Sequence, residues 1–166
     1  MTTRNDYTDS EWELLTDLPR LAALGATAAE EGGPVASTRE LWTSMMELAQ
    51  SAQTQHANNM LIQEVMRDIS QRSDDEPSIM GWKPDSGEPL GNAIVAQALS
   101  TASRVRDVLA SQATPEEAAE YTQWVLRIAR AGCEAVRSGL FGLVGAQMTV
   151  AEEQYVRDLA TALGAT

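Results

Sequence analysis

The stretch Leu18–Ala28, LPRLAALGATA, has a counterpart later in the chain, Val125–Ala135, VLRIARAGCEA. In both stretches an arginine and small or aliphatic residues lead to a glycine, Gly25 in the first and Gly132 in the second. Glycine costs about 1 kcal/mol relative to alanine in a helix interior. Its position in two alanine-rich helices therefore predicts close helix crossings in two related halves of the protein.

Further helices are marked by their N-terminal caps. In a capping box, a Ser or Thr side chain accepts the N3 amide and a Glu at N3 accepts the N-cap amide. This order occurs at Thr8–Glu11, Ser37–Glu40, Thr114–Glu117 and Thr149–Glu152. Around these caps apolar residues return every three or four positions, which is typical of helices. Valine and isoleucine form no strand-length run, so we expect no sheet.

We predict a single all-α domain over residues 1–166, a helical bundle of about six helices in two pseudo-repeated halves. Half 1 covers residues 8–72, an irregular loop covers 73–92, and half 2 covers 93–164. The last helix should end near Gly164, which suits a C-terminal cap.

Two helix boundaries depend on local chemistry. Proline lacks an amide and fits the first turn of a helix, so we expect a bend or a restart at Asp17–Pro19 rather than a smooth helix. Residues 37–72 form either one long helix or two, with a break at His56–Asn59. In the second case Asn58 or Asn59 would cap the following helix.

The charge balance limits the partners. The formal net charge is −12, from 12 basic and 24 acidic side chains, so phosphate backbones should be repelled and nucleic acid is not expected as a partner. No apolar run is long enough to cross a membrane, and the N-terminus lacks the blocks of a signal peptide. Cys133 is the only cysteine, which excludes an intrachain disulfide. We therefore expect a cytoplasmic protein in which Cys133 is a buried apolar residue.

The run Ala28–Glu40, AAEEGGPVASTRE, resembles the signature of the TerB-like (tellurite-resistance-associated) helical family. The shared features are a small-residue helix, acidic residues and glycine, and a Ser or Thr cap three residues before a glutamate. The resemblance implies an all-helical bundle of two halves and acidic loop residues that bind a divalent cation. The matching carboxylates are Glu30, Glu31 and Glu40. Three carboxylates alone do not fill the six to eight oxygen ligands of calcium. The alternative is that Glu40 closes a capping box while Glu30 and Glu31 are solvated.

Two apolar segments could bind a ligand or a partner. Leu140–Gly145, LFGLVG, holds the only phenylalanine, and we take Phe141 and Leu143 as candidate interaction residues. Burial in the protein's own core is the alternative. Trp82, also a candidate, lies in the 73–92 loop with Met80, where the two could form a lid over apolar surface.

The other polar residues have simpler readings. The single histidine, His56, lies in a polar segment and is expected at the surface. Two pairs of carboxylates, Glu116 with Glu120 and Glu152 with Glu153, should lie on helix exteriors or in first turns. The sequence carries no phosphate-binding glycine loop, cofactor fingerprint or catalytic triad, so no cofactor is expected beyond a possible divalent cation.

Three functions remain open. The first is a non-enzymatic interaction or scaffold protein of a bacterial stress-response or signalling type, which self-associates through an apolar helix face or binds another protein. The second is a divalent-cation-binding module of the TerB-like kind. The third is a small-molecule binder with a pocket under the 73–92 loop.

Overall fold

The computed structural model describes residues 2–29, 59–72, 90–141 and 148–165, without the side chains of residues 72 and 135–141. These residues form a 3-10 helix, η1, and five α-helices, and no strand occurs among them. The all-α prediction is confirmed for this part of the chain. The elements are η1 (Arg4–Asp6), α1 (Asp9–Ala28), α3 (Met60–Arg72), α4 (Leu90–Gln112), α5 (Pro115–Phe141) and α6 (Val150–Ala162).

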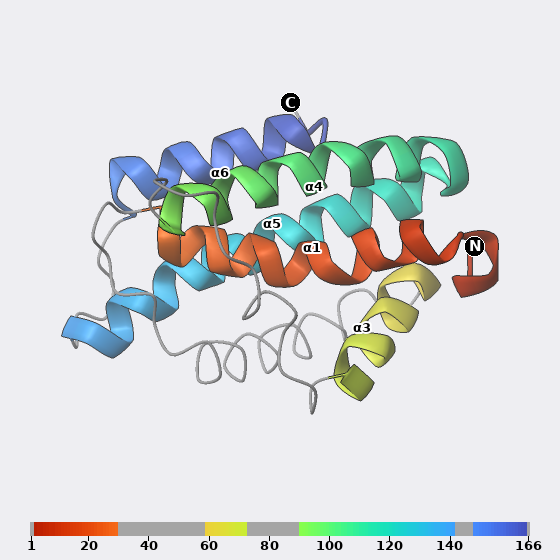
Figure 1. Cartoon of the computed structure of the whole chain (residues 1–166), viewed down its shortest axis with the longest axis horizontal. Coiled ribbons are helices and arrows are strands. Elements are labelled where there is room, and N and C mark those ends of the chain that lie inside the picture. Colours follow the sequence, from red (N-terminus) through yellow and green to blue (C-terminus); the bar gives the residue numbers. More distant parts are fainter. Residues whose placement is uncertain (1, 30–58, 73–89, 142–147, 166) are drawn as a thin grey trace.

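Helix α1 is the central element of this arrangement (Figure 1). It packs along α4 and α5, with α6 near its C-terminal half and α3 beside its N-terminal end. Every residue from Leu21 to Ala28 is buried, as expected for a helix that is apolar all round. The other helices bury one stripe each. On α3, for example, Leu61, Ile62, Val65, Met66 and Ile69 are buried as the sequence pattern predicts.

The described helices begin where their caps predict. Thr8 and Thr149 form complete capping boxes with Glu11 and Glu152. At the start of α5 the amide of Glu117 donates to Thr114 Oγ1 and the amide of Thr114 donates to Glu117 Oε2, both at 3.3 Å. These predictions are confirmed, whereas the Ser37–Glu40 box lies outside the described residues.

Two further predicted caps are confirmed. Asn59 Oδ1 accepts the amide of Ile62 at 3.1 Å, so Asn59 caps α3. Gly164 follows α6 with φ +77°, and the amides of Gly164 and Ala165 donate to Thr161 and Ala160 oxygens. This is the Schellman arrangement that favours glycine. Asn59 itself is not helical, so one uninterrupted helix over residues 37–72 is excluded, and residues 37–58 lie outside the described residues.

Of the two alternatives predicted at Asp17–Pro19, the restart is wrong, because α1 runs through Pro19 as one helix. Proline has no amide to donate to the carbonyl of Leu15, four residues earlier. The buried hydroxyl of Tyr121 on α5 donates to that carbonyl oxygen at 2.7 Å. A side chain from another helix thus replaces the hydrogen bond that proline removes.

Helix α4 begins at Leu90, slightly before the predicted start of half 2 at about residue 93. Gly91 lies in the first turn of this helix rather than in the 73–92 loop. A Cβ atom there would lie 3.0 Å from the carbonyl oxygen of Ala28, so the glycine allows the start of α4 to approach the end of α1. Glycine, which is common in loops, here allows two helices to pack closely.

Both glycines of the paired stretches lie at helix crossings, as predicted. A Cβ on Gly25 would lie 2.5 Å from Cζ of Tyr155 on α6, whose hydroxyl donates to the carbonyl oxygen of Ala22 at 3.0 Å. A Cβ on Gly132 would lie 3.1 Å from Cβ of Ala26 and 3.2 Å from the oxygen of Ala23. The pseudo-repeat itself and the count of six helices stay predictions.

Candidate functional site

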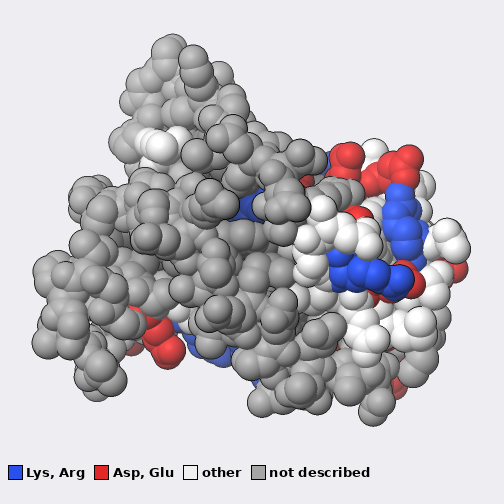
Figure 2. Space-filling view, turned by 90° about the horizontal axis from the view of Figure 1, so that it is seen from below, with Lys and Arg blue, Asp and Glu red and all other residues white. Residues whose placement is uncertain are grey.

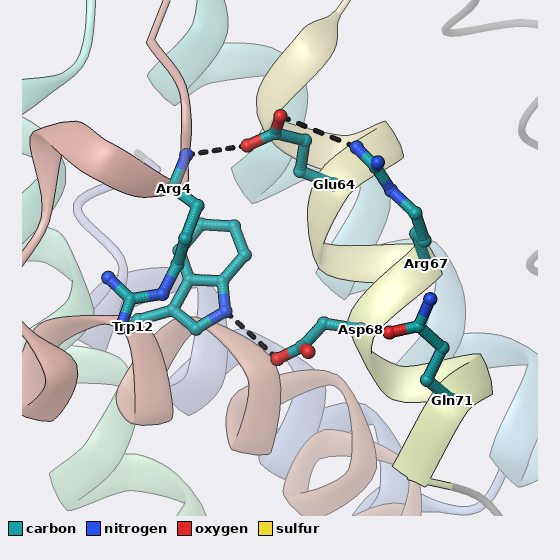
Figure 3. A pocket seen from close by; sticks show the side chains of 6 residues that line it. All are labelled: Arg4, Trp12, Glu64, Arg67, Asp68 and Gln71. Carbon is teal, nitrogen blue, oxygen red and sulfur yellow. Dashed lines mark hydrogen bonds and ion pairs between the residues drawn. The ribbon is translucent and has the colours of Figure 1, made fainter.

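A polar cleft of about 300 Å³ lies between the N-terminal segment and α3 (Figure 3). Residues 2–8, here named the strap, precede α1 and form one wall together with Trp12. Helix α3 forms the other wall. The lining side chains are Arg4, Trp12, Glu64, Arg67, Asp68 and Gln71.

Hydrogen bonds to carboxylates hold the strap against two helices. The amide of Thr2 donates to Glu117 Oε1 on α5 at 2.7 Å, and the hydroxyls of Thr2 and Tyr7 lie 3.0 Å apart. The amide of Arg4 donates to Glu64 Oε2 on α3 at 2.5 Å. Charge-assisted bonds of this kind are stronger than neutral ones. The strap wall is therefore fixed before any ligand binds.

Trp12 is the floor of the cleft, with only 3% of its surface exposed. Its indole nitrogen donates to Asp68 Oδ2 at 2.9 Å. The Tyr7 ring lies 5.8 Å from it, centroid to centroid, and the Arg4 guanidinium lies 5.4 Å from its centroid. This distance is within the range of a cation–π interaction. The indole is thus held by contacts from both walls.

The two arginines of the cleft differ in how firmly they are held. Arg4 donates to the carbonyl oxygen of Tyr7 at 2.8 Å and forms an ion pair with Asp9. Arg67 pairs with Glu64 at 3.4 Å, and 65% of its side chain is exposed. A pair of this length with an exposed arginine contributes little to stability. Arg67 is accordingly the side chain of the rim that is most easily rearranged.

The electrostatics of the strap favour ionised carboxylates. Burial acts to raise the pKa of Glu117, but hydrogen bonds from Thr2 and Thr114 outweigh it, so the pKa is lowered overall. The backbone amide and hydroxyl of Thr3 lower the pKa of Asp6. Near neutral pH both groups are therefore available as acceptors that hold the strap.

A second cleft, of about 410 Å³, lies between the end of α4, the start of α5 and the residues after α6. Small and aliphatic side chains such as Ala110, Ala118 and Leu163 line much of it. Its one charged side chain, Arg106, pairs with the neighbouring Asp107 at 2.9 Å. Fewer polar groups converge here, so the cleft at the strap is the better candidate site.

The candidate site residues from the sequence lie elsewhere. Glu30, Glu31, Glu40, Trp82 and Leu143 are outside the described residues. Phe141 is the last residue of α5, but its side chain is not described. The cation site and the pocket under the 73–92 loop therefore stay predictions. Within the described ranges no group of three or more His, Cys, Asp or Glu side chains is placed to hold a metal ion.

Most of the simpler readings hold where the structure describes them. Cys133 is fully buried, as predicted. Glu116, Glu120 and Glu153 are exposed on their helices. Glu152 lies in the first turn of α6, as predicted, and is only 3% exposed; its carboxylate turns back to accept the Thr149 amide at 2.8 Å. His56 lies outside the described residues.

The cleft at the strap does not follow from the sequence pattern. That pattern places Trp12 in a helix and gives the strap no role. One signal is present: Glu64 and Asp68 are four residues apart, which places both carboxylates on one face of α3. Their partners come from residues 56 to 60 positions away, a separation that local patterns do not reveal.

Comparisons of the chain with family models, with curated proteins and with solved structures each give no match. The TerB-like resemblance therefore remains a prediction. None of the described helices is long and apolar enough to cross a bilayer. The functional argument accordingly depends on the geometry of the cleft.

Proposed function

We propose that the chain is a non-enzymatic interaction protein that binds another protein at the cleft between the strap and α3. The observation that carries the proposal is the fixed Trp12 floor beside a charged rim. Tryptophan and arginine are the residue types that most often dominate binding energy at protein interfaces. Here Trp12, Arg4 and Arg67 line the same cleft.

Preorganisation supports binding in particular. The indole of Trp12 and the backbone of Arg4 already donate to carboxylates of α3, so little ordering is required when a partner arrives. Binding loses less free energy when the site is ordered beforehand. The cleft also opens to the surface beside exposed Arg67 and Gln71, where a protein segment can reach it.

The proposal can be tested by photo-crosslinking in cells. A benzophenone amino acid at Gln71, on the rim, should capture the partner. The same amino acid at Gln97, exposed on α4 on the other side of α1, should not (Figure 1). Asp68→Arg, which places a cation in the cleft, should abolish the capture from position 71. Identical crosslinks from positions 71 and 97, or none from 71, would reject the proposal.

Self-association through an apolar helix face is a separate proposal, carried over from the sequence. Light scattering over a range of concentrations tests it directly. A strict monomer would remove it and would leave the cleft proposal unaffected. A dimer whose formation is insensitive to Asp68→Arg would place the self-association surface away from the cleft.

A further inference from the structure

Carboxylates outnumber basic side chains on the elements that form the cleft at the strap. The strap and the first turns of α1 carry Asp6, Asp9, Glu11 and Glu13, and α3 adds Glu64 and Asp68. Figure 2 shows acidic side chains gathered around a few basic ones on the described part of this face. The chain as a whole has a net charge of −12. A field of this sign attracts basic partners and repels acidic ones.

Arg4 of the chain itself shows which kind of side chain the cleft binds well. Its guanidinium lies over the Trp12 indole, donates to the Tyr7 carbonyl and pairs with Asp9. An aromatic face, a carbonyl oxygen and a carboxylate are the groups that recognise a planar guanidinium. Arg4 fills one side of the cleft, and the space of about 300 Å³ beside it faces Glu64 and Asp68.

From this arrangement we infer that the partner presents a basic segment, and that an arginine side chain of that segment enters the cleft between Glu64 and Asp68. The inference rests on the function proposed above. The entering guanidinium replaces Arg67 on Glu64, where the existing pair is long and the Arg67 side chain is exposed. Each carboxylate accepts several hydrogen bonds, so the bonds from the Arg4 amide and the Trp12 indole are kept.

A peptide titration tests the inference. The probe is a short blocked peptide in which arginine alternates with glycine and serine, and the signal is the indole N–H resonance of Trp12. The chain has four tryptophans, so a Trp12→Phe sample assigns that resonance. The expected result is a saturable shift that weakens as salt is added. A lysine peptide of the same length should bind more weakly, because ammonium lacks the planar fork.

Substitutions in the cleft should change the affinity in opposite directions. Glu64→Gln and Asp68→Asn should each weaken binding about three- to ten-fold, the range for charge contacts at a partly buried site. Arg67→Gln, which removes an exposed competitor, should strengthen it about two- to five-fold. The matched control is Glu153→Gln on α6, which removes the same charge on the opposite side of the bundle (Figure 1).

Each outcome is decisive. The inference is overturned if the Trp12 resonance shows no saturable shift. It is also overturned if Glu64→Gln and Glu153→Gln weaken binding equally, because the peptide is then attracted only by the net charge of the chain.

The Glu64→Gln variant could disturb the fold, which the dispersion of the indole resonances would reveal. In that case the exposed Arg67→Gln variant decides alone, and unchanged or weaker binding overturns the inference. A glutamate peptide that shifts Trp12 instead would overturn the basic partner while the cleft function stands. Failure of crosslinking at position 71 would reject the function itself.

Discussion

At its N-terminal end α1 is tied to α3 and α5 by hydrogen bonds, whereas at its C-terminal end it is packed against α5 and α6 through glycine and alanine. The first region includes Trp12 bonded to Asp68 and the Leu15 carbonyl bonded to Tyr121. The second includes Gly25 under Tyr155 and Gly132 against Ala26. Small residues let helix backbones approach closely, but they offer no side-chain groups that could bind a partner. At the N-terminal end the helices are joined by polar side chains instead, and the cleft lies beside these side chains.

The largest effect is expected at the close-packed end. In Gly25→Ala the new methyl group meets the buried ring of Tyr155, which cannot move without losing its hydrogen bond to Ala22. Overpacking of this kind costs about 1–3 kcal/mol and outweighs the gain of about 1 kcal/mol in helix propensity. Urea unfolding should show a lower midpoint. Gly132→Ala, where the contact is 3.1 Å, is the milder comparison, and a stabilised Gly25→Ala would contradict the described packing.

A smaller loss is expected at the polar end. Tyr121→Phe leaves the buried carbonyl of Leu15 without its hydroxyl donor, because Pro19 supplies no amide. An unsatisfied buried group costs about 1–3 kcal/mol. Tyr155→Phe should cost less, about 0.5–1.5 kcal/mol, because the Ala22 carbonyl is also within reach of the Ala26 amide in the helix.

A double-mutant cycle sharpens this point. In Pro19→Ala the new amide at position 19 can donate to Leu15, so adding Tyr121→Phe should cost less than it does in the parent chain. Denaturant unfolding of the four proteins gives the coupling energy. Additive effects would mean that the Tyr121 hydroxyl does not substitute for the missing amide.

The difference between the two regions also explains what the sequence predicts well. Caps and apolar periodicity are local, so the starts of α1, α5 and α6 follow from Thr8, Thr114 and Thr149. The paired glycines in alanine-rich helices are also visible in the local sequence, and they predict close helix crossings. The helix restart predicted at Asp17–Pro19 is wrong, because the hydrogen bond that proline removes at Leu15 is replaced by one from Tyr121, 106 positions from Leu15. The cleft is missed because the strap is bonded to Glu64 and Glu117, which are equally invisible to local patterns.

At the start of α6, a cap substitution should have a moderate effect. Thr149→Ala removes the hydroxyl that accepts the Glu152 amide at 3.2 Å. Loss of an N-cap costs typically about 1 kcal/mol. Thr149→Ser keeps the hydroxyl and should restore most of the stability in thermal unfolding. Equal losses for alanine and serine would show that the methyl group of Thr149, rather than its hydroxyl, matters.

The smallest effect concerns the tie between the strap and α5. The pKa of Glu117 is lowered in the folded state, so the unfolded chain binds more protons as the pH falls past the usual value near 4.5. The stabilisation is therefore present above that pH and is lost as the pH falls through the folded pKa. As the pH falls from about 5 to about 3, the Glu117→Gln variant should therefore lose less unfolding free energy than the parent chain.

Glu116→Gln is the matched control, because it removes a neighbouring exposed carboxylate from the same helix start. Urea midpoints measured across this pH range compare the two variants with the parent. If Glu116→Gln and Glu117→Gln give the same profile, the effect is one of net charge and not of the strap. If only Glu117→Gln is flatter, the hydrogen bond from the Thr2 amide couples the strap to the bundle. In that case the strap wall of the cleft loses one of its carboxylate ties in acid while the close-packed end of α1 stays intact.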